Sequence, residues 1–202
     1  MAPLDSLILS AALQRWCAAM REAAPEFNAL DARLGDGDLG TTLQKCAENM
    51  EAVLPVGDTP AVVFKACASA CAKASGSSFG TLLAQAFLVA AKSPQAQQPL
   101  DRQAVQALLP ALLDALSARG GAKLGDKTML DSMAAIAEAL RAAPPAADAA
   151  ALKAAACAGA QSALDALRGQ PNRIGRARMF AEQSKGLDDP GMVAVLRMVQ
   201  AL

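Results

Sequence analysis

Apolar residues recur every three or four positions along most of this chain, a spacing that places them on one face of an α-helix. In residues 6–24 the recurring positions are Leu9, Leu13, Trp16 and Met20. They form one apolar stripe, so this segment is predicted to be an amphipathic helix.

Seven further segments are rich in strong helix formers and end at polar, proline or glycine breaks. The predicted helices cover residues 41–53, 60–74, 78–92, 101–120, 126–143, 148–168 and 191–202. Residues 93–99 (SPQAQQP) are predicted to form a polar loop, and after a break at 169–171 the helical pattern is predicted to resume up to Lys185.

Strands are not predicted, because β-branched residues are scarce and no segment alternates between apolar and polar positions. Eight helices of similar length, with no change of composition that would mark a linker, predict an all-α fold. We expect a single domain over residues 1–202, built as a bundle or barrel of eight antiparallel amphipathic helices. The chemistry is then expected in connecting loops at one end.

Composition narrows the classes of partner. Hydrophobic residues make up 53% of the 202 residues, and 19 basic residues balance 19 acidic ones. Without a net positive field, neither nucleic acid nor an anionic membrane is an expected partner. No uncharged apolar run approaches the ~20 residues of a membrane-spanning helix. Asp5 stands where a secretory signal would be basic, so a cytoplasmic protein is expected.

The cysteine and histidine counts limit the chemistry further. Five cysteines without a Cys-x-x-Cys pair are typical of a reducing compartment, and Cys67 and Cys71 are predicted to be small buried thiols. Histidine is absent, which excludes a Ser-His-Asp or Cys-His centre and a histidine zinc site in this chain. Catalysis would rest on carboxylates, Lys, Arg, backbone amides, a metal or a partner.

One segment, LDARLGDGDLGTT, interrupts the helical pattern. Gly35, Gly37 and Gly40 match the G-x-G-x-x-G pattern of dinucleotide-binding folds, but that pattern requires a preceding strand. No strand is predicted here, and the aspartates between the glycines would repel a pyrophosphate unless a cation intervened. We therefore reject the dinucleotide-binding interpretation.

The same segment does not fit an EF-hand, which needs a glutamate at the twelfth loop position. Counting from Asp31 reaches Thr42, and counting from Asp36 reaches Ala47. The segment thus offers three carboxylates without a recognised loop motif, those of Asp31, Asp36 and Asp38. Hard oxygen ligands that converge in a loop suit one or two Mg²⁺ ions; the alternative is that these aspartates only cap helices in a polar turn.

Four other segments carry glycine or hydroxyl groups near predicted helix starts: 74–80 (ASGSSFG), 125–129 (GDKTM), 175–178 (GRAR) and 188–191 (DDPG). Helix capping or turn formation explains each of them alone. Together they are loops that could surround a magnesium nucleotide, since helix N-termini stabilise anions.

Five motifs resemble a known family: LDxxxGDGDxG at 30–40, ASGxxFG at 74–80, GDKTMLD at 125–131, GRA at 175–177 and DPG at 189–191. In this order and spacing, they resemble the nucleotide-binding L subunit of dihydroxyacetone kinases, which is also the C-terminal domain of single-chain members. The resemblance implies a barrel of eight antiparallel helices and a phosphotransferase activity.

The resemblance also implies site residues and partners. Asp31, Asp36 and Asp38 would hold two Mg²⁺ ions, and Arg176 would be the catalytic residue that neutralises charge on the transferred phosphoryl group. A partner subunit or domain would hold dihydroxyacetone covalently through a histidine. The residues that would contact ADP or ATP are Leu39, Gly40, Thr41, Thr42, Ser75, Gly76, Gly121, Met129, Arg176, Asp189, Pro190 and Gly191.

Several departures leave the phosphate donor and the sugar open. Leu39 stands where phosphotransferase-dependent members have His, GLDDPG at 186–191 replaces GHQDPG, and GRARMFAEQS at 175–184 replaces GRASYLGERS. The donor is either ATP or a phosphocarrier that recharges bound ADP. Alternatives to a ketose kinase are a non-catalytic nucleotide-binding module that docks on a regulator or carrier, the nucleotide domain of a fatty acid kinase, and a structural bundle.

Overall fold

The computed structural model describes residues 2–74 and 77–202. Within them lie nine α-helices: α1 (Ser6–Glu22), α2 (Ala24–Asp31), α3 (Leu39–Glu51), α4 (Pro60–Ala74), α5 (Ser78–Lys92), α6 (Arg102–Gly120), α7 (Met129–Ala142), α8 (Ala149–Leu167) and α9 (Pro190–Ala201). Two 3₁₀ helices, η1 (Pro94–Gln97) and η2 (Arg176–Phe180), complete the described elements. The described residues form no strand, so the predicted all-α fold is confirmed.

The helix that the sequence analysis missed is α2. Pro25 stands in its first turn, and a proline inside a continuous helix would remove a backbone hydrogen bond. The chain therefore ends α1 at Glu22 and restarts at Ala24. Asp31, which we expected in a loop, is the last residue of this extra helix, so the described part of the chain has nine α-helices where eight were predicted.

Other boundaries also differ from the sequence-based expectation. The predicted loop 93–99 contains η1, and α7 begins at Met129 rather than at residue 126 because Thr128 and Asp131 form a capping box at its start. The helix predicted to resume up to Lys185 is only the short η2, followed by turns. Nowhere in residues 2–74 and 77–202 does a helix combine the length and apolar character needed to cross a bilayer.

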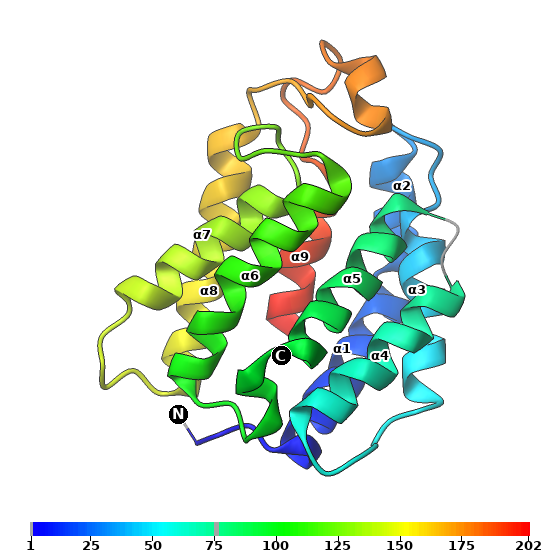
Figure 1. Ribbon diagram of the computed structural model, residues 1–202. Helices are drawn as coiled ribbons and strands as arrows, with labels where there is room; N and C mark the ends of the chain where they lie inside the picture. Colours follow the sequence, from blue (N-terminus) through cyan, green and yellow to red (C-terminus); the bar gives the residue numbers. More distant parts are fainter. Residues whose placement is uncertain (1, 75–76) are drawn as a thin grey trace.

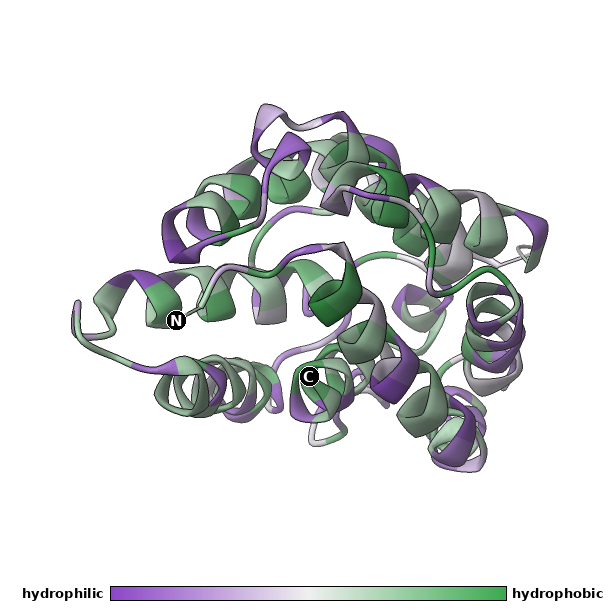
Figure 2. Ribbon diagram, turned by 90° about the horizontal axis from the view of Figure 1, so that it is seen from below, coloured by the Kyte–Doolittle hydropathy of each residue, from purple (hydrophilic) through white to green (hydrophobic). Residues whose placement is uncertain are grey.

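The helices close into a ring (Figure 1). Each helix contacts the next in the order α1, α3, α4, α5, α6 and α7, and α9 closes the ring by contacting both α7 and α1. Helix α8 packs against α7 and α9, and α2 packs against α3 and α9. The helices carry both hydrophobic and hydrophilic residues, as Figure 2 shows from below, and the three- or four-residue spacing of the hydrophobic ones lets each helix turn one face to the core.

Sulfur is prominent in the core between α1, α3 and α4. The side chains of Cys17, Cys46, Met50, Cys67 and Cys71 are fully buried, which agrees with the prediction of small buried thiols. Burial raises the pKa of the Cys17 and Cys67 thiols to about 12, because a thiolate is poorly solvated there. These thiols are therefore protonated and unreactive in the folded chain.

Apart from α2, which continues from α1 after a single residue, successive helices run in opposite directions, and this brings the loops of the site together. Loops 32–38, 121–128 and 168–189 and the start of α5 lie together at one end of the barrel, at the top of Figure 1. Loops 52–59, 93–101 and 143–148 lie at the other end. Segments far apart in sequence can therefore contribute to one site at the upper end.

Candidate functional site

Three carboxylates meet where α2 leads into α3. Asp31 ends α2, and Asp36 and Asp38 follow in the loop before α3. One carboxylate oxygen from each of the three lies within 4.8 Å of the others. Asp31 and Asp38 are half-buried and Asp36 is exposed, so the cluster faces the surface with hard oxygen donors of the kind that Mg²⁺ prefers.

Backbone hydrogen bonds hold Asp31 in place. Its Oδ2 accepts the N–H of Asp38 at 2.9 Å and the N–H of Leu39 at 3.3 Å, at the start of α3. A carboxylate there also stabilises the positive end of the helix dipole. A Cβ at Gly35 would lie 2.6 Å from the other oxygen, Oδ1, so the absence of a side chain at position 35 leaves that oxygen accessible.

The start of α3 packs tightly on α2. A Cβ at Gly40 would lie 1.9 Å from the carbonyl oxygen of Ala24, so only glycine allows this approach. Asn28 fastens the contact, because its Oδ1 accepts the Thr41 N–H at 3.1 Å and its Nδ2 donates to Thr41 Oγ1 at 3.2 Å. The sequence analysis missed Asn28, which belongs to the helix that it did not predict.

A cavity of about 210 Å³ opens in front of the carboxylate cluster. Nine of the residues singled out by the family resemblance line it: Asp31, Asp36, Asp38, Leu39, Met129, Arg176, Asp189, Pro190 and Gly191. The other lining residues, which were not singled out, are Leu34, Ser77, Ser78, Phe79, Leu82, Thr128, Ile174, Gly175 and Ala177. Most of these lie inside or beside the five motifs, so proximity to a motif was the sequence signal that could have identified them.

Six expected contact residues do not line the cavity or lie outside the described residues. Gly40 and Thr41 are engaged with α2, and Thr42 is buried in α3. Gly121 caps the end of α6 in the left-handed conformation, and its Cβ position lies 3.9 Å from Ile174, which lines the cavity. Ser75 and Gly76 lie outside the described residues.

The cavity lining has two chemically different parts. Phe79, Leu82, Met129 and Ile174 contribute apolar side chains, which suit a flat, poorly hydrated group. The carboxylates and Arg176 contribute charged groups, which suit a cation and a phosphate. The cavity can therefore accommodate a ligand with an aromatic part and a charged part.

Arg176 reaches the carboxylate cluster from the α8–α9 connection. It begins η2 directly after Gly175, whose φ of +67° favours glycine. Its guanidinium forms an ion pair with Asp36. Both side chains are about half exposed, so the pair adds little stability; its importance is that it places a cation beside the three carboxylates.

Asp189 caps the start of α9 at the edge of the cavity. Its Oδ1 accepts the Met192 N–H at 2.9 Å, and its Oδ2 accepts the Asn172 Nδ2 at 2.7 Å. Loss of water around the carboxyl raises the pKa of Asp189 to about 6; these two hydrogen bonds and the charge of Lys127 lower it without cancelling the effect of burial.

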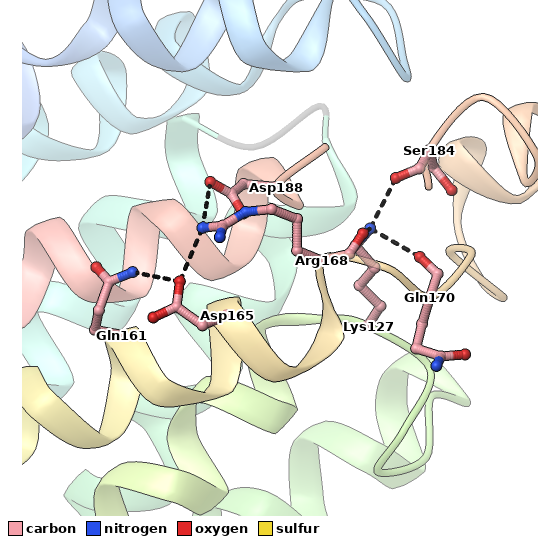
Figure 3. A network of polar contacts seen from close by, with 7 residues as sticks. All are labelled: Lys127, Gln161, Asp165, Arg168, Gln170, Ser184 and Asp188. Carbon is pink, nitrogen blue, oxygen red and sulfur yellow. Dashed lines mark hydrogen bonds and ion pairs between the residues drawn. The ribbon is translucent and has the colours of Figure 1, made fainter. Parts of the chain in front are cut away.

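A polar network fastens the α8–α9 connection (Figure 3). Arg168 Nε donates to Asp188 Oδ1 at 2.8 Å, and an Arg168 Nη lies 2.9 Å from Asp165. Lys127 is buried among backbone carbonyls of residues 168–184. Burial lowers the pKa of Lys127. Apart from the GDKTMLD motif around Lys127, no local sequence pattern pointed to this network.

These features define a helical barrel with a cavity at one end, which is lined by carboxylates and depends on glycines for close backbone packing. Residues 33–202 match the family model described as the DAK2 domain, and the chain belongs to this family. The matched segment starts after Asp31, so the first carboxylate of the cluster precedes it.

Known proteins similar to this chain include enzymes and enzyme subunits. Human triokinase/FMN cyclase is 32% identical over 195 residues, which are 94% of this chain and 33% of that protein. The ADP-binding subunit DhaL of the PEP-dependent dihydroxyacetone kinase of Escherichia coli (strain K12) is 30% identical over 182 residues, which are 86% of this chain and 84% of the subunit. The chain spans about a third of the length of triokinase/FMN cyclase from human, rat, cow and mouse.

A solved structure has the same fold. The dihydroxyacetone kinase of C. freundii in complex with AMP-PNP and Mg²⁺ superposes with a TM-score of 0.73 at 22% identity. The match covers 100% of this chain and 34% of the C. freundii chain. The helical barrel is therefore shared with one part of that larger kinase.

The raised pKa of Asp189 predicts a pH-dependent contribution to stability. The folded chain holds this proton more tightly than the unfolded chain, in which an aspartate has a pKa of about 3.9. The contribution is therefore fully present below about pH 4 and is lost as the pH rises through about 6. We expect the free energy of unfolding of the wild type, relative to Asp189→Asn, to fall by roughly 2 kcal/mol between about pH 4 and pH 7 in denaturant titrations.

The matched control for this measurement is Asp114→Asn, since Asp114 is exposed on α6. The stability difference between this variant and the wild type should change little over the same pH range. A difference for Asp189→Asn that is constant with pH would contradict the assignment of the raised pKa.

Proposed function

We propose that residues 1–202 act as one nucleotide-binding unit of a small-ketose kinase of the dihydroxyacetone kinase type. This unit holds ADP or ATP with Mg²⁺, and the phosphoryl group passes to a sugar held by a partner subunit or domain. The observation that carries the proposal is the cavity that is lined both by three carboxylates and Arg176 and by an apolar wall, formed by Phe79, Leu82, Met129 and Ile174.

The carboxylate cluster fits Mg²⁺. Asp31, Asp36 and Asp38 offer oxygens within 4.8 Å of one another, and Gly35 leaves Asp31 Oδ1 accessible. Magnesium retains waters and completes its coordination with substrate phosphates. We propose that these three residues hold two ions, and the magnesium named for the C. freundii complex supports this ligand class.

The apolar wall fits the base of a nucleotide. Phe79, Met129 and Ile174 can cover an aromatic ring, while the phosphates extend toward the carboxylates and Arg176. The name of the E. coli relative, an ADP-binding subunit, supports a nucleotide in this cavity. Leu39 and residues 189–191 border the same space and would complete the contacts.

Phosphoryl transfer requires positioning and charge neutralisation more than covalent chemistry by the protein. Bound Mg²⁺ would supply positive charge to the phosphate oxygens. Arg176 would exchange its ion pair with Asp36 for a contact with the transferred group, and would stabilise the charge that develops there. Asp36 would then be free to act as a metal ligand.

The sugar is assigned to a partner, because the chain has no histidine to hold a ketose covalently. Leu124 is 65% exposed and Met179 is 71% exposed, and both belong to loops that border the cavity. A sugar-binding subunit that covers this end would remove these apolar side chains from water. The phosphate donor is either ATP or a phosphocarrier subunit that recharges bound ADP.

The metal ligands can be tested by binding. Asp36→Asn or Asp38→Asn should weaken binding of Mg²⁺–ADP by more than about tenfold, because each change removes a charged oxygen ligand worth at least ~1.4 kcal/mol. Isothermal titration calorimetry measures the affinity. Asp114→Asn, at an exposed position on α6 that does not line the cavity, should bind as the wild type does; unaltered affinity in both cluster variants would refute the metal site.

Arg176 has a matched control two residues away. Arg176→Ala should slow phosphoryl transfer in the reconstituted complex by roughly a hundredfold, since one charge-stabilising group is lost. The melting temperature should stay nearly unchanged because the Arg176 side chain is more than half exposed. Arg178 is exposed in the same 3₁₀ helix, and equal loss of activity in Arg178→Ala would argue against a specific role.

If this chain binds the nucleotide and a partner binds the sugar, the chain alone should be inactive as a kinase. Incubation with ATP, Mg²⁺ and a panel of small ketoses should give turnover only after a histidine-bearing sugar-binding subunit is added. Steady turnover without added protein would contradict the half-site proposal. Nucleotide binding without turnover in any reconstitution would instead favour a non-catalytic module that docks on a regulator or carrier.

A further inference from the structure

Lys127 is an unusual residue for its position. It lies in the loop before α7 with a φ of +63°, and among residues 2–74 and 77–202 it is the one residue other than glycine with a positive φ. Such a conformation persists in a side-chain-bearing residue when its surroundings fix it. The Lys127 side chain is also almost completely buried, at 1% exposure, so the reason for lysine here must be what its ammonium contacts.

The ammonium uses all three of its hydrogen-bond donors. Nζ donates to the carbonyl oxygens of Arg168 at 3.1 Å, Gln170 at 2.9 Å and Ser184 at 2.8 Å. The first two belong to the start of the α8–α9 connection and the third to its end, and Figure 3 shows Lys127 between Gln170 and Ser184. Gly186 N–H also donates to the Arg168 carbonyl at 2.8 Å. Lys127 therefore ties the two ends of the 168–189 segment together.

Asn172 extends this link to the cavity. Its Nδ2 donates to the Lys127 carbonyl at 2.9 Å and to Asp189 Oδ2 at 2.7 Å, and its backbone N–H donates to Ser184 Oγ at 2.9 Å. Lys127 is followed directly by Thr128 and Met129, both of which line the cavity. One buried residue thus joins the α6–α7 loop to the α8–α9 connection.

The part of the segment that carries Arg176 depends on this base. None of residues 173–183 is buried, and among them Ile174 alone packs against the hydrophobic core, so the segment has little packing of its own to fix its position. Arg173 N–H reaches the Asp126 carbonyl at 3.2 Å, next to Lys127 in sequence. Where Arg176 stands relative to the carboxylate cluster is therefore determined largely at the base of the segment.

We propose that Lys127 is a positioning residue of the nucleotide site. It holds the base of the 168–189 segment so that Arg176 faces the carboxylate cluster, and through Asn172 it holds Asp189 at the start of α9. Lys127 does not itself line the cavity and acts only through these residues. The proposal rests on the proposed nucleotide-binding function.

The test uses Lys127→Gly, because glycine adopts the positive φ without strain and the variant therefore removes only the side chain. Lys153→Met, at an exposed position on α8, is the control for loss of a positive charge. In hydrogen–deuterium exchange, residues 173–183 of Lys127→Gly should exchange at least about tenfold faster than in the wild type, while the barrel helices keep their protection. A primary alkylammonium ion should restore protection, and an alcohol of the same length should not.

Calorimetry with Mg²⁺–ADP then separates positioning from general stability. Lys127→Gly should weaken binding by about tenfold in the wild-type background and by a clearly smaller factor when Arg176→Ala is already present, since Arg176 is one of the two cavity residues through which Lys127 acts. Unchanged affinity in Lys127→Gly, or the same tenfold loss in the Arg176→Ala background, would overturn the proposal.

Two outcomes keep the inference distinct from the proposed function. If the wild type and Lys153→Met both fail to bind Mg²⁺–ADP, the nucleotide function is wrong, while the exchange of residues 173–183 still decides whether Lys127 fastens them. If Lys127→Gly does not fold, Asn172→Ala replaces it, because that variant keeps the ammonium and removes the link to Asp189. Affinity equal to that of the wild type in Asn172→Ala would then overturn the proposal.

Discussion

The hydrogen bonds from the start of α3 to Asp31 are the constraint on which the candidate site depends. By accepting the N–H groups of Asp38 and Leu39, one carboxylate oxygen joins the end of α2 to the start of α3. The loop between them must then close tightly, which brings Asp36 and Asp38 back toward Asp31. The same closure requires small residues: Gly35 beside the carboxylate and Gly40 against the carbonyl of Ala24.

A cluster of three carboxylates needs positive charge nearby, and the fold brings it from a distant part of the chain. Arg176 reaches Asp36 from the α8–α9 connection, whose middle is exposed while its base is fastened by buried polar contacts. This arrangement separates two requirements. Arg176, in the exposed part, can exchange its ion-pair partner when a ligand binds. The fastened base limits the positions that Arg176 can occupy, so less conformational entropy is lost on binding.

The sequence predicted the helices well because their apolar stripes are local patterns. It missed α2, whose eight residues include only two buried ones, Ala24 and Phe27, too few to form a stripe. Nine of the expected site residues line one cavity, because the motifs that contain them lie in loops at the same end of the barrel. The nucleotide and metal roles of those residues stay predictions.

Asn28, Lys127 and Asn172 could not be found in the same way. Each contributes through hydrogen bonds to backbone or side-chain atoms of another segment, and such contacts exist only after the helices have packed. A lysine in a loop reads as a solvated charge until the carbonyls around it are known. Long-range polar contacts of this kind have no periodicity that a sequence pattern could show.

The sulfur-rich core gives the folded chain a built-in reporter of its own opening. Cys17 and Cys67 are fully buried with thiol pKa values near 12, so an alkylating reagent can modify them only when α1, α3 and α4 separate. Cys157, on α8, is less deeply buried, so a smaller opening free energy would suffice for its modification. The relative labelling rates of these native thiols therefore compare the frequency of local opening near α8 with that of separation of the core helices, without any engineered residue.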